Sequence, residues 1–88
     1  MKILHRFWFS FASPIEFSPL NFGCGVTAYD YKDATALLET LVFAGKQVPG
    51  IKSVIEDVDV QLLDESRVRP NMGNVAKRGV WFPLGYES

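Results

Sequence analysis

The sequence has only one cysteine, Cys24, and only one histidine, His5. A single cysteine excludes an intramolecular disulfide and a zinc site built from four cysteines. A metal site would need carboxylate ligands beside these two residues, and no motif supplies them at a suitable spacing. We therefore expect no metal and no other cofactor. A chain without disulfides suits a reducing compartment, so we expect a cytoplasmic protein.

No apolar run approaches the roughly 20 residues that a membrane-spanning helix requires. The apolar stretch 1–12 is interrupted by His5 and Arg6 and lacks a following cleavage site, so we do not interpret it as a signal peptide. Neither sign of charge is in large excess, because the formal net charge is −1. This balance argues against broad, charge-driven binding to nucleic acid. We expect no contact with a membrane and do not expect nucleic acid as the main partner.

The composition is that of a folded protein, with 48% hydrophobic and 22% charged residues in a chain of 88. This length favours one globular domain over residues 1–88. Aromatic residues make up 14% of the chain, which is high for so short a sequence. Either the core is built from aromatic rings, or some of the rings face a partner.

Residues 26–45 predict the end of a strand followed by an amphipathic helix. Asp30 is suited to cap the helix N-terminus, and Asp33 lies in the first turn, where the helix dipole favours an acid. Gly45 suits a left-handed C-cap, and Pro49 prevents continuation. The apolar residues that repeat at helical spacing and form the expected buried face are Ala34, Leu37, Leu38, Leu41 and Ala44.

Four segments have the composition and alternation of strands: 2–11, 22–29, 51–60 and 79–86. Pro83 lacks an amide proton, which confines the last strand to a sheet edge or a bulge. The order β-β-α-β-β predicts an α+β fold. We expect a two-layer sandwich in which one helix packs on a mainly antiparallel four-stranded sheet. The connection through the helix leaves open one parallel pair of neighbouring strands.

One helix cannot cover both faces of a four-stranded sheet. The second face must be polar, covered by the long loops, or covered by another chain. The alternation in the first strand places Trp8 on that second face. The third strand carries Glu56 within its apolar pattern, which is typical of an edge strand or a bulge.

Residues 67–78 carry four positive charges and no negative charge, on Arg67, Arg69, Lys77 and Arg78. Glycine and asparagine in this segment allow positive φ angles, so the loop could form a small anion-binding concavity. The simpler interpretation is a solvated loop that pairs with the acidic segment 53–65. If the segment binds an anion or a nucleic acid, its four charges should converge on one patch beside Trp81.

Cys24 and His5 could form a nucleophile and its base. Cys24 lies in the second strand and His5 in the first, so contact between them is conceivable. A free cysteine is also a common small core residue. A small enzyme that uses these two residues is therefore the least favoured hypothesis, and we assign no catalytic residue.

The first hypothesis is a non-catalytic domain that binds another protein or a second copy of itself, which would give a homodimer. Strand addition at a sheet edge is one available mode. The second hypothesis is an anion- or nucleic-acid-binding domain. The binding residues that we predict from the aromatic excess and the basic segment are Trp8, Arg67, Arg69, Lys77, Arg78 and Trp81. No motif in the chain identifies a family.

Overall fold

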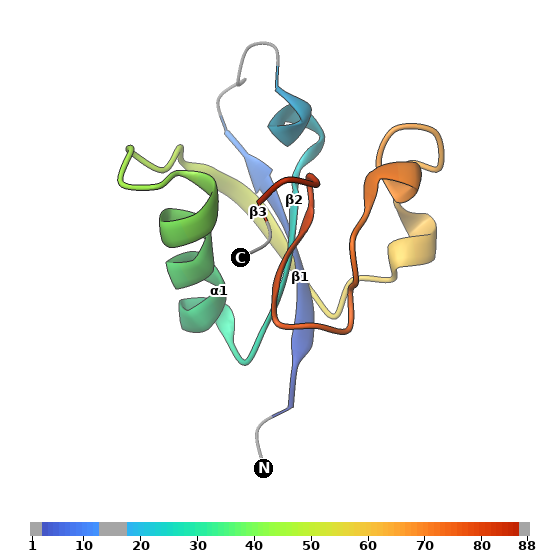
Figure 1. The fold of residues 1–88 in the computed structure, drawn as a ribbon, viewed down its shortest axis with the longest axis horizontal. Coiled ribbons are helices and arrows are strands. Elements are labelled where there is room, and N and C mark those ends of the chain that lie inside the picture. Colours follow the sequence, from blue (N-terminus) through green and yellow to red (C-terminus); the bar gives the residue numbers. More distant parts are fainter. Residues whose placement is uncertain (1–2, 13–17, 87–88) are drawn as a thin grey trace.

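The computed structural model describes residues 3–12 and 18–86 (Figure 1). The strands are β1 (His5–Phe11), β2 (Cys24–Ala28), β3 (Ile51–Glu56) and β4 (Gly79–Phe82). The helix α1 (Tyr31–Leu37) continues directly into the π-helical turn η2 (Leu38–Val42). Three short 3₁₀ helices lie in the connections: η1 (Pro19–Phe22), η3 (Val60–Leu62) and η4 (Arg69–Asn71).

The four strands form one sheet in the order β3-β1-β2-β4, and every neighbouring pair is antiparallel. The helix packs on one face of this sheet, which confirms the predicted α+β fold. β2 and β3, which the helix connects, are not neighbours, because β1 lies between them. The parallel pair that the connection left open is therefore not formed.

The third strand ends earlier than its apolar pattern predicts. It stops at Glu56 rather than at residue 60, because Asp57 has a φ of 57° and turns the chain out of the sheet. Asp is among the few non-glycine residues that tolerate this left-handed conformation. The next residue, Val58, donates its amide to the carbonyl of Arg6 at 3.1 Å and is buried. The turn thus sends the chain from the sheet edge onto the second face.

The start of the helix follows the prediction. The Asp30 side chain accepts a hydrogen bond from the amide of Asp33 at 2.7 Å. The carboxylate of Asp33 in turn accepts from the amide of Tyr29 at 3.1 Å. The two acids therefore satisfy one amide of the first turn, that of Asp33, and the amide of Tyr29 just before the N-cap.

The end of the helix differs from the prediction, because the last turn is a π-turn. The amide of Phe43 bonds to the carbonyl of Leu38, five residues earlier, at 3.0 Å. This wider turn brings Phe43 above Leu38 on the buried face and leaves Ala44 exposed. The buried stripe therefore continues through Phe43 and not through Ala44. Gly45 has the left-handed conformation expected after the helix, with a φ of 88°.

Two separate apolar clusters lie on the two faces of the sheet. The first lies between the sheet and the helix, and its larger buried members are Phe7, Phe9, Leu20, Leu38 and Phe43. The second lies on the opposite face and consists of Trp8, Val58, Val68, Trp81 and Phe82. The high aromatic content is thus used mainly inside the molecule.

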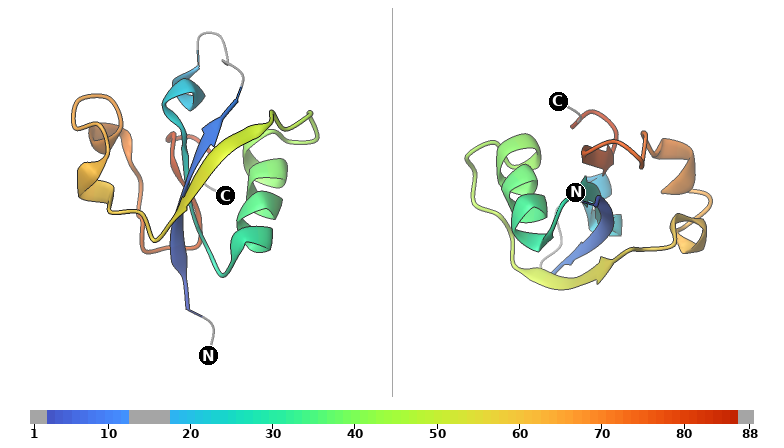
Figure 2. Two further views of the ribbon diagram at one scale, coloured as in Figure 1. Left: turned by 180° about the vertical axis from the view of Figure 1, so that it is seen from behind. Right: turned by 90° about the horizontal axis from the view of Figure 1, so that it is seen from below.

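The second face is covered by residues 57–78, which we call the covering segment. Figure 2 shows it on the side of the sheet opposite to the helix. Val58 and Val68 of this segment are buried against the two tryptophans. The hydroxyl of Thr27 in β2 donates to the carbonyl of Val75 at 2.6 Å and fixes the segment to the sheet. The sequence left three possibilities for this face: a polar surface, cover by the long loops, or cover by another chain. Cover by the chain's own loop is the one that the structure shows.

The Trp81 ring packs directly over Gly25, which has no side chain to exclude it. A Cβ added at Gly25 would overlap the six-membered ring of Trp81. The indole N–H of Trp81 is buried and has no hydrogen-bond partner among the described residues. Such a group costs stability, so we infer that the ring is held in place by its packing rather than by a polar contact.

We predict that Gly25→Ala lowers the free energy of unfolding by about 1–3 kcal/mol, because the added methyl group displaces the Trp81 ring. Urea unfolding followed by tryptophan fluorescence measures this change. Gly50→Ala is the matched control, since its Cβ would meet only Ala12 at an ordinary 3.8 Å. The control should change stability by less than about 0.5 kcal/mol. Equal stability of both variants would contradict the proposed packing.

Candidate functional site

The two edges of the sheet differ in how well they are protected. At the β4 edge the amide of Gly73 donates to the carbonyl of Trp81 at 2.7 Å. Pro83, which follows the strand, has no amide proton to offer. Within the part of the chain that the structure describes, the covering segment and this proline therefore close the β4 edge.

The β3 edge is open. β3 is the outermost strand, and among residues 3–12 and 18–86 only β1 is paired with it. Two of its apolar side chains remain accessible, since Val54 is 38% and Ile55 is 50% exposed. Lys52, Ser53 and Glu56 are also exposed. We call Ile51–Glu56 the open edge.

The side chains of the open edge alternate between the two faces of the sheet. Val54 is paired with Phe9, and Glu56 with Phe7, so these two lie on the helix side. Ile55 is paired with Trp8 and lies on the side of the covering segment. The register shifts by one residue between Ser10 and Phe11. This shift decides on which face Ile51 lies.

β3 has one more residue than β1 at this shift, because Ser10 is paired with Ser53 and Phe11 with Ile51. Lys52 is therefore the extra residue of a β-bulge. As a result Ile51 lies on the helix side, where it packs against the first cluster. The N-terminal end of β3 is thereby anchored to the first cluster, while Val54 and Ile55 stay accessible.

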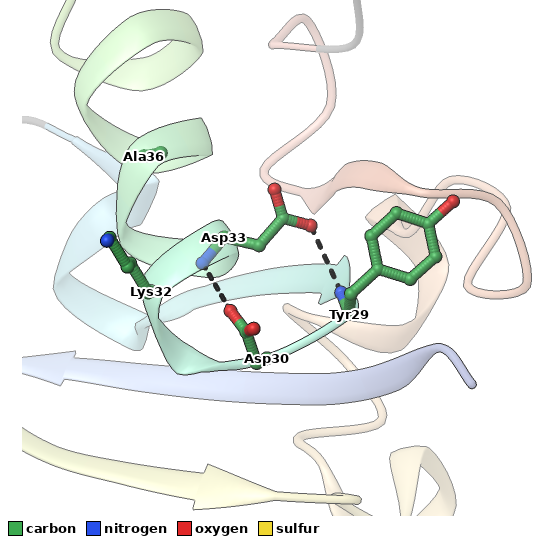
Figure 3. Close-up of a pocket in the computed structure, with 5 residues that line it drawn as sticks. All are labelled: Tyr29, Asp30, Lys32, Asp33 and Ala36. Carbon is green, nitrogen blue, oxygen red and sulfur yellow. Dashed lines mark hydrogen bonds between the residues drawn. The ribbon is translucent and has the colours of Figure 1, made fainter. Parts of the chain in front are cut away.

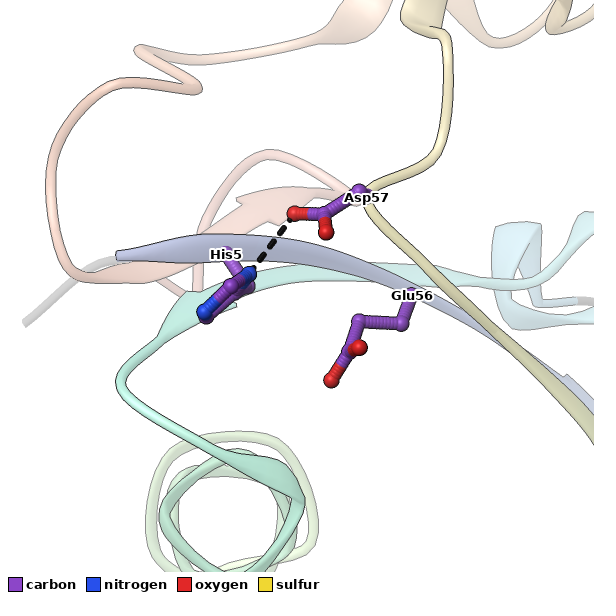
Figure 4. Close-up of side chains that lie close together, drawn as sticks. All are labelled: His5, Glu56 and Asp57. Carbon is purple, nitrogen blue, oxygen red and sulfur yellow. Dashed lines mark hydrogen bonds and ion pairs between the residues drawn. The ribbon is translucent and has the colours of Figure 1, made fainter. Parts of the chain in front are cut away.

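His5, Glu56 and Asp57 gather where β3 ends (Figure 4). Nδ1 of His5 lies 2.8 Å from Oδ1 of Asp57, and ligand atoms of all three side chains lie within 4.8 Å of one another. One imidazole and two carboxylates are donors that a zinc or manganese ion accepts. All three lie at or near the surface, and no further feature of the described residues points to an ion. We interpret the His5–Asp57 hydrogen bond as support for the turn at Asp57.

The predicted basic residues do not gather into one patch. The guanidinium of Arg67 lies 5.6 Å from the ring centre of Phe22, which precedes β2. The guanidinium of Arg78 lies 5.6 Å from the ring centre of Tyr29, which follows β2. These two arginines are thus at opposite ends of the same strand. Whether they bind a ligand stays a prediction.

Two of the three predicted arginines have a carboxylate partner within the fold. Nε and Nη2 of Arg78 donate to the two carboxylate oxygens of Asp33, and these hydrogen bonds raise the pKa of Arg78. Arg69 lies 3.8 Å from Glu65 in an exposed ion pair. Lys77 is exposed, and its amide bonds to the carbonyl of Asn74 at 3.4 Å.

An acidic residue shapes the beginning of the basic segment. The carboxylate of Asp64 accepts from the amide of Arg67 at 2.8 Å and from the amide and hydroxyl of Ser66 at 2.9 Å. These hydrogen bonds, the one from Arg67 first, hold the pKa of Asp64 below its usual value. The acidic and basic segments are therefore joined locally, which agrees with the solvated-loop interpretation.

Trp8 and Trp81, the two aromatic residues predicted to bind a partner, are buried. Trp8 is 7% and Trp81 is 1% exposed, and their rings stack with centres 5.9 Å apart. In this structure they contribute to the second cluster. A partner would reach them only if the covering segment moved away.

Two surface depressions border the helix and the covering segment. One, of about 320 Å³, lies at the start of α1, where the side chains of Asp30 and Asp33 are engaged in capping (Figure 3). The other, of about 300 Å³, is lined by Arg67, Asn71 and residues 82–84. Asn71 there donates its side-chain amide to the carbonyl of Arg67. In both, the polar groups named serve the local fold.

Cys24 and His5 are not brought together. In the β1–β2 pairing His5 stands opposite Ala28, whereas Cys24 stands opposite Phe9. These positions are four residues apart along β1, or roughly 13 Å at the usual rise of a strand. Cys24 is fully buried, and its burial raises the pKa of the thiol to about 12. This position is that of a core residue.

No protein-family model, curated protein or solved structure matches this chain. None of the helices in the described residues is both long and apolar enough to cross a membrane.

The open edge was only partly visible in the sequence. Glu56 within an apolar pattern indicated an edge strand, and the structure confirms that β3 lies at an edge. The accessibility of Val54 and Ile55 was not predicted, because it depends on the order of the strands. The adjacent pair of β-branched residues in a short, charged strand was the available signal.

We predict that Cys24 reacts with iodoacetamide at least about a hundredfold more slowly in the native protein than in guanidinium chloride, because both the thiolate population and access are reduced. An exposed cysteine introduced by Thr40→Cys in a Cys24→Ala chain is the control and should react at the unfolded rate. Fast native labelling of Cys24 would support the enzyme hypothesis instead. The folded-state pKa lies above the ordinary 9.0, so the stabilising effect of the neutral thiol is lost as pH rises from about 9 towards 12.

Proposed function

We propose that this protein is a non-catalytic interaction domain that binds an extended segment of protein chain along the open edge. The segment would add a fifth strand next to β3. Backbone hydrogen bonds would supply affinity, and the exposed side chains of β3 would select the sequence.

The observation that supports this proposal is the contrast between the two edges. The β4 edge is closed by the Gly73–Trp81 hydrogen bond and by Pro83. The open edge instead presents Val54 and Ile55, one on each face of a strand whose outer side is unpaired among the described residues. Exposed edge strands template pairing with other chains, and folded proteins usually protect them. The β3 edge is left open although the opposite edge of the same sheet is closed, and this contrast favours a binding role.

The chemistry of the open edge sets the kind of segment that fits. A strand added beside β3 would place side chains next to Val54 on the helix side and next to Ile55 on the other side. Apolar residues on both faces of the added segment would therefore be favoured. The contact is small, so we expect a dissociation constant in the micromolar range.

The test is selection from a library of displayed random peptides against the immobilised protein. We expect enriched peptides with neighbouring β-branched or aromatic residues, because such side chains would pack on Val54 and Ile55. Binding of a synthetic copy is then measured by titration. Ile55→Lys should weaken it by at least about tenfold, because the lysine removes the apolar contact and opposes strand pairing.

Leu62→Lys is the matched control, because Leu62 is 83% exposed and lies in the covering segment, outside β3. This variant receives the same change of side chain and should bind the peptide as the wild type does. Circular dichroism establishes that both variants fold. Peptides that bind all three proteins equally, or a selection without enrichment, would contradict the proposal.

A further inference from the structure

We propose that the segment received by the open edge is β3 of a second copy of this chain, paired antiparallel about a two-fold axis at Val54. This inference rests on the proposed function and names its partner. It is carried by the register of β3 and by the charges of Lys52 and Glu56.

Symmetry restricts how two copies of β3 can pair. A closed homodimer of two edge strands needs a two-fold axis perpendicular to the sheet, which makes the pair antiparallel. Residues that stand opposite each other in an antiparallel pair must point to the same face. Each side chain keeps its face under this rotation. The axis must therefore pass between one residue and the same residue of the second copy, which we describe as the residue on the axis.

Three residues near the middle of the strand could lie on the axis: Ser53, Val54 and Ile55. With Ser53 on the axis, Ile51 would stand opposite Ile55, and Lys52 opposite Val54. The bulge at Lys52 defeats this register, because Ile51 lies on the helix side and Ile55 on the side of the covering segment.

With Ile55 on the axis, Glu56 would stand opposite Val54, which places a carboxylate beside an apolar side chain. Ser53 would stand opposite Asp57, which has left the strand with a φ of 57°. This register pairs Ile55 with its own copy, but it places Val54 beside Glu56 twice and loses the two symmetry-related pairs between Ser53 and Asp57. It is less favourable than a register that keeps β3 paired from residue 52 to residue 56.

With Val54 on the axis, the five residues 52–56 of each copy are paired. Lys52 then stands opposite Glu56 of the second copy, and the symmetry repeats this contact on the other side of the axis. Val54 packs against its own copy between the two ion pairs. Ile55 stands opposite Ser53 on the other face. This register alone places opposite charges next to each other.

The two charges are available for this role. Neither Lys52 nor Glu56 makes an ion pair in the part of the chain that the structure describes. They are four residues apart in one strand, which is too far for a contact with each other. Both are exposed, so pairing across the dimer would not require a hydrogen bond or ion pair among the described residues to break.

The test is reversal of the two charges, with the monomer–dimer equilibrium measured by sedimentation. Lys52→Glu places an acid opposite Glu56 of the second copy, and Glu56→Lys places a cation opposite Lys52 of the second copy. Each should raise the dissociation constant of the dimer by about tenfold or more, since like charges replace opposite ones at two places. The double variant carries both changes and should return to the wild-type value.

A mixture of the two single variants should also form a dimer, because each supplies the charge that the other lacks. Lys46→Glu is the control for net charge, as it lies outside β3 and is exposed. It should leave the dissociation constant unchanged. A wild type that stays monomeric at millimolar concentration, or a dimer indifferent to both single charge reversals, would overturn the inference. Peptide binding that Ile55→Lys weakens would still uphold the proposed function in that case.

Discussion

The left-handed turn at Asp57 is the feature on which the second half of the structure depends. It ends β3 after six residues and directs the chain across to the face that the helix does not cover. The hydrogen bond from His5 to Asp57 and the bond from Val58 to Arg6 hold the turn against the first strand. The covering segment begins here, and the burial of the two tryptophans follows from it.

This turn also explains why one edge of the sheet is covered and the other is not. By leaving β3 at Asp57, the chain moves away from that edge and passes over the second face to β4. Gly73 then meets the carbonyl of Trp81 and closes the far edge. A single chain of this length protects one edge and one face with the same segment. The cost is that the β3 edge, among the described residues, receives no cover.

Local signals in the sequence were sufficient for the elements and the fold class. The cap at Asp30 and the acid at Asp33 involve residues within a few positions of each other, so the sequence contains the whole interaction. The π-turn was not predicted, because Phe43 replaces Ala44 on the buried face only when the sheet offers a site for the larger ring. The last turn is decided by packing and not by spacing.

The candidate site was harder to predict for the same reason. Arg67 and Arg78 belong to one short basic segment and carry the same charge, yet they lie at opposite ends of β2. Trp8 and Trp81 were expected to face a partner because one helix leaves a face uncovered, whereas the covering segment fills that face. Only the order of the strands shows that Val54 and Ile55 remain accessible. Strand order is a long-range property that no short pattern records.

The charges at Lys52 and Glu56 have two consequences for an open edge. An uncharged edge with two β-branched residues would pair with many strands in many registers, which leads to aggregation. A lysine and a glutamate, two residues to either side of Val54, penalise every register that places like charges or an apolar side chain opposite them. In the proposed dimer the same two charges favour one register. The features that protect the edge from indiscriminate pairing are thus the ones that would give it a specific partner.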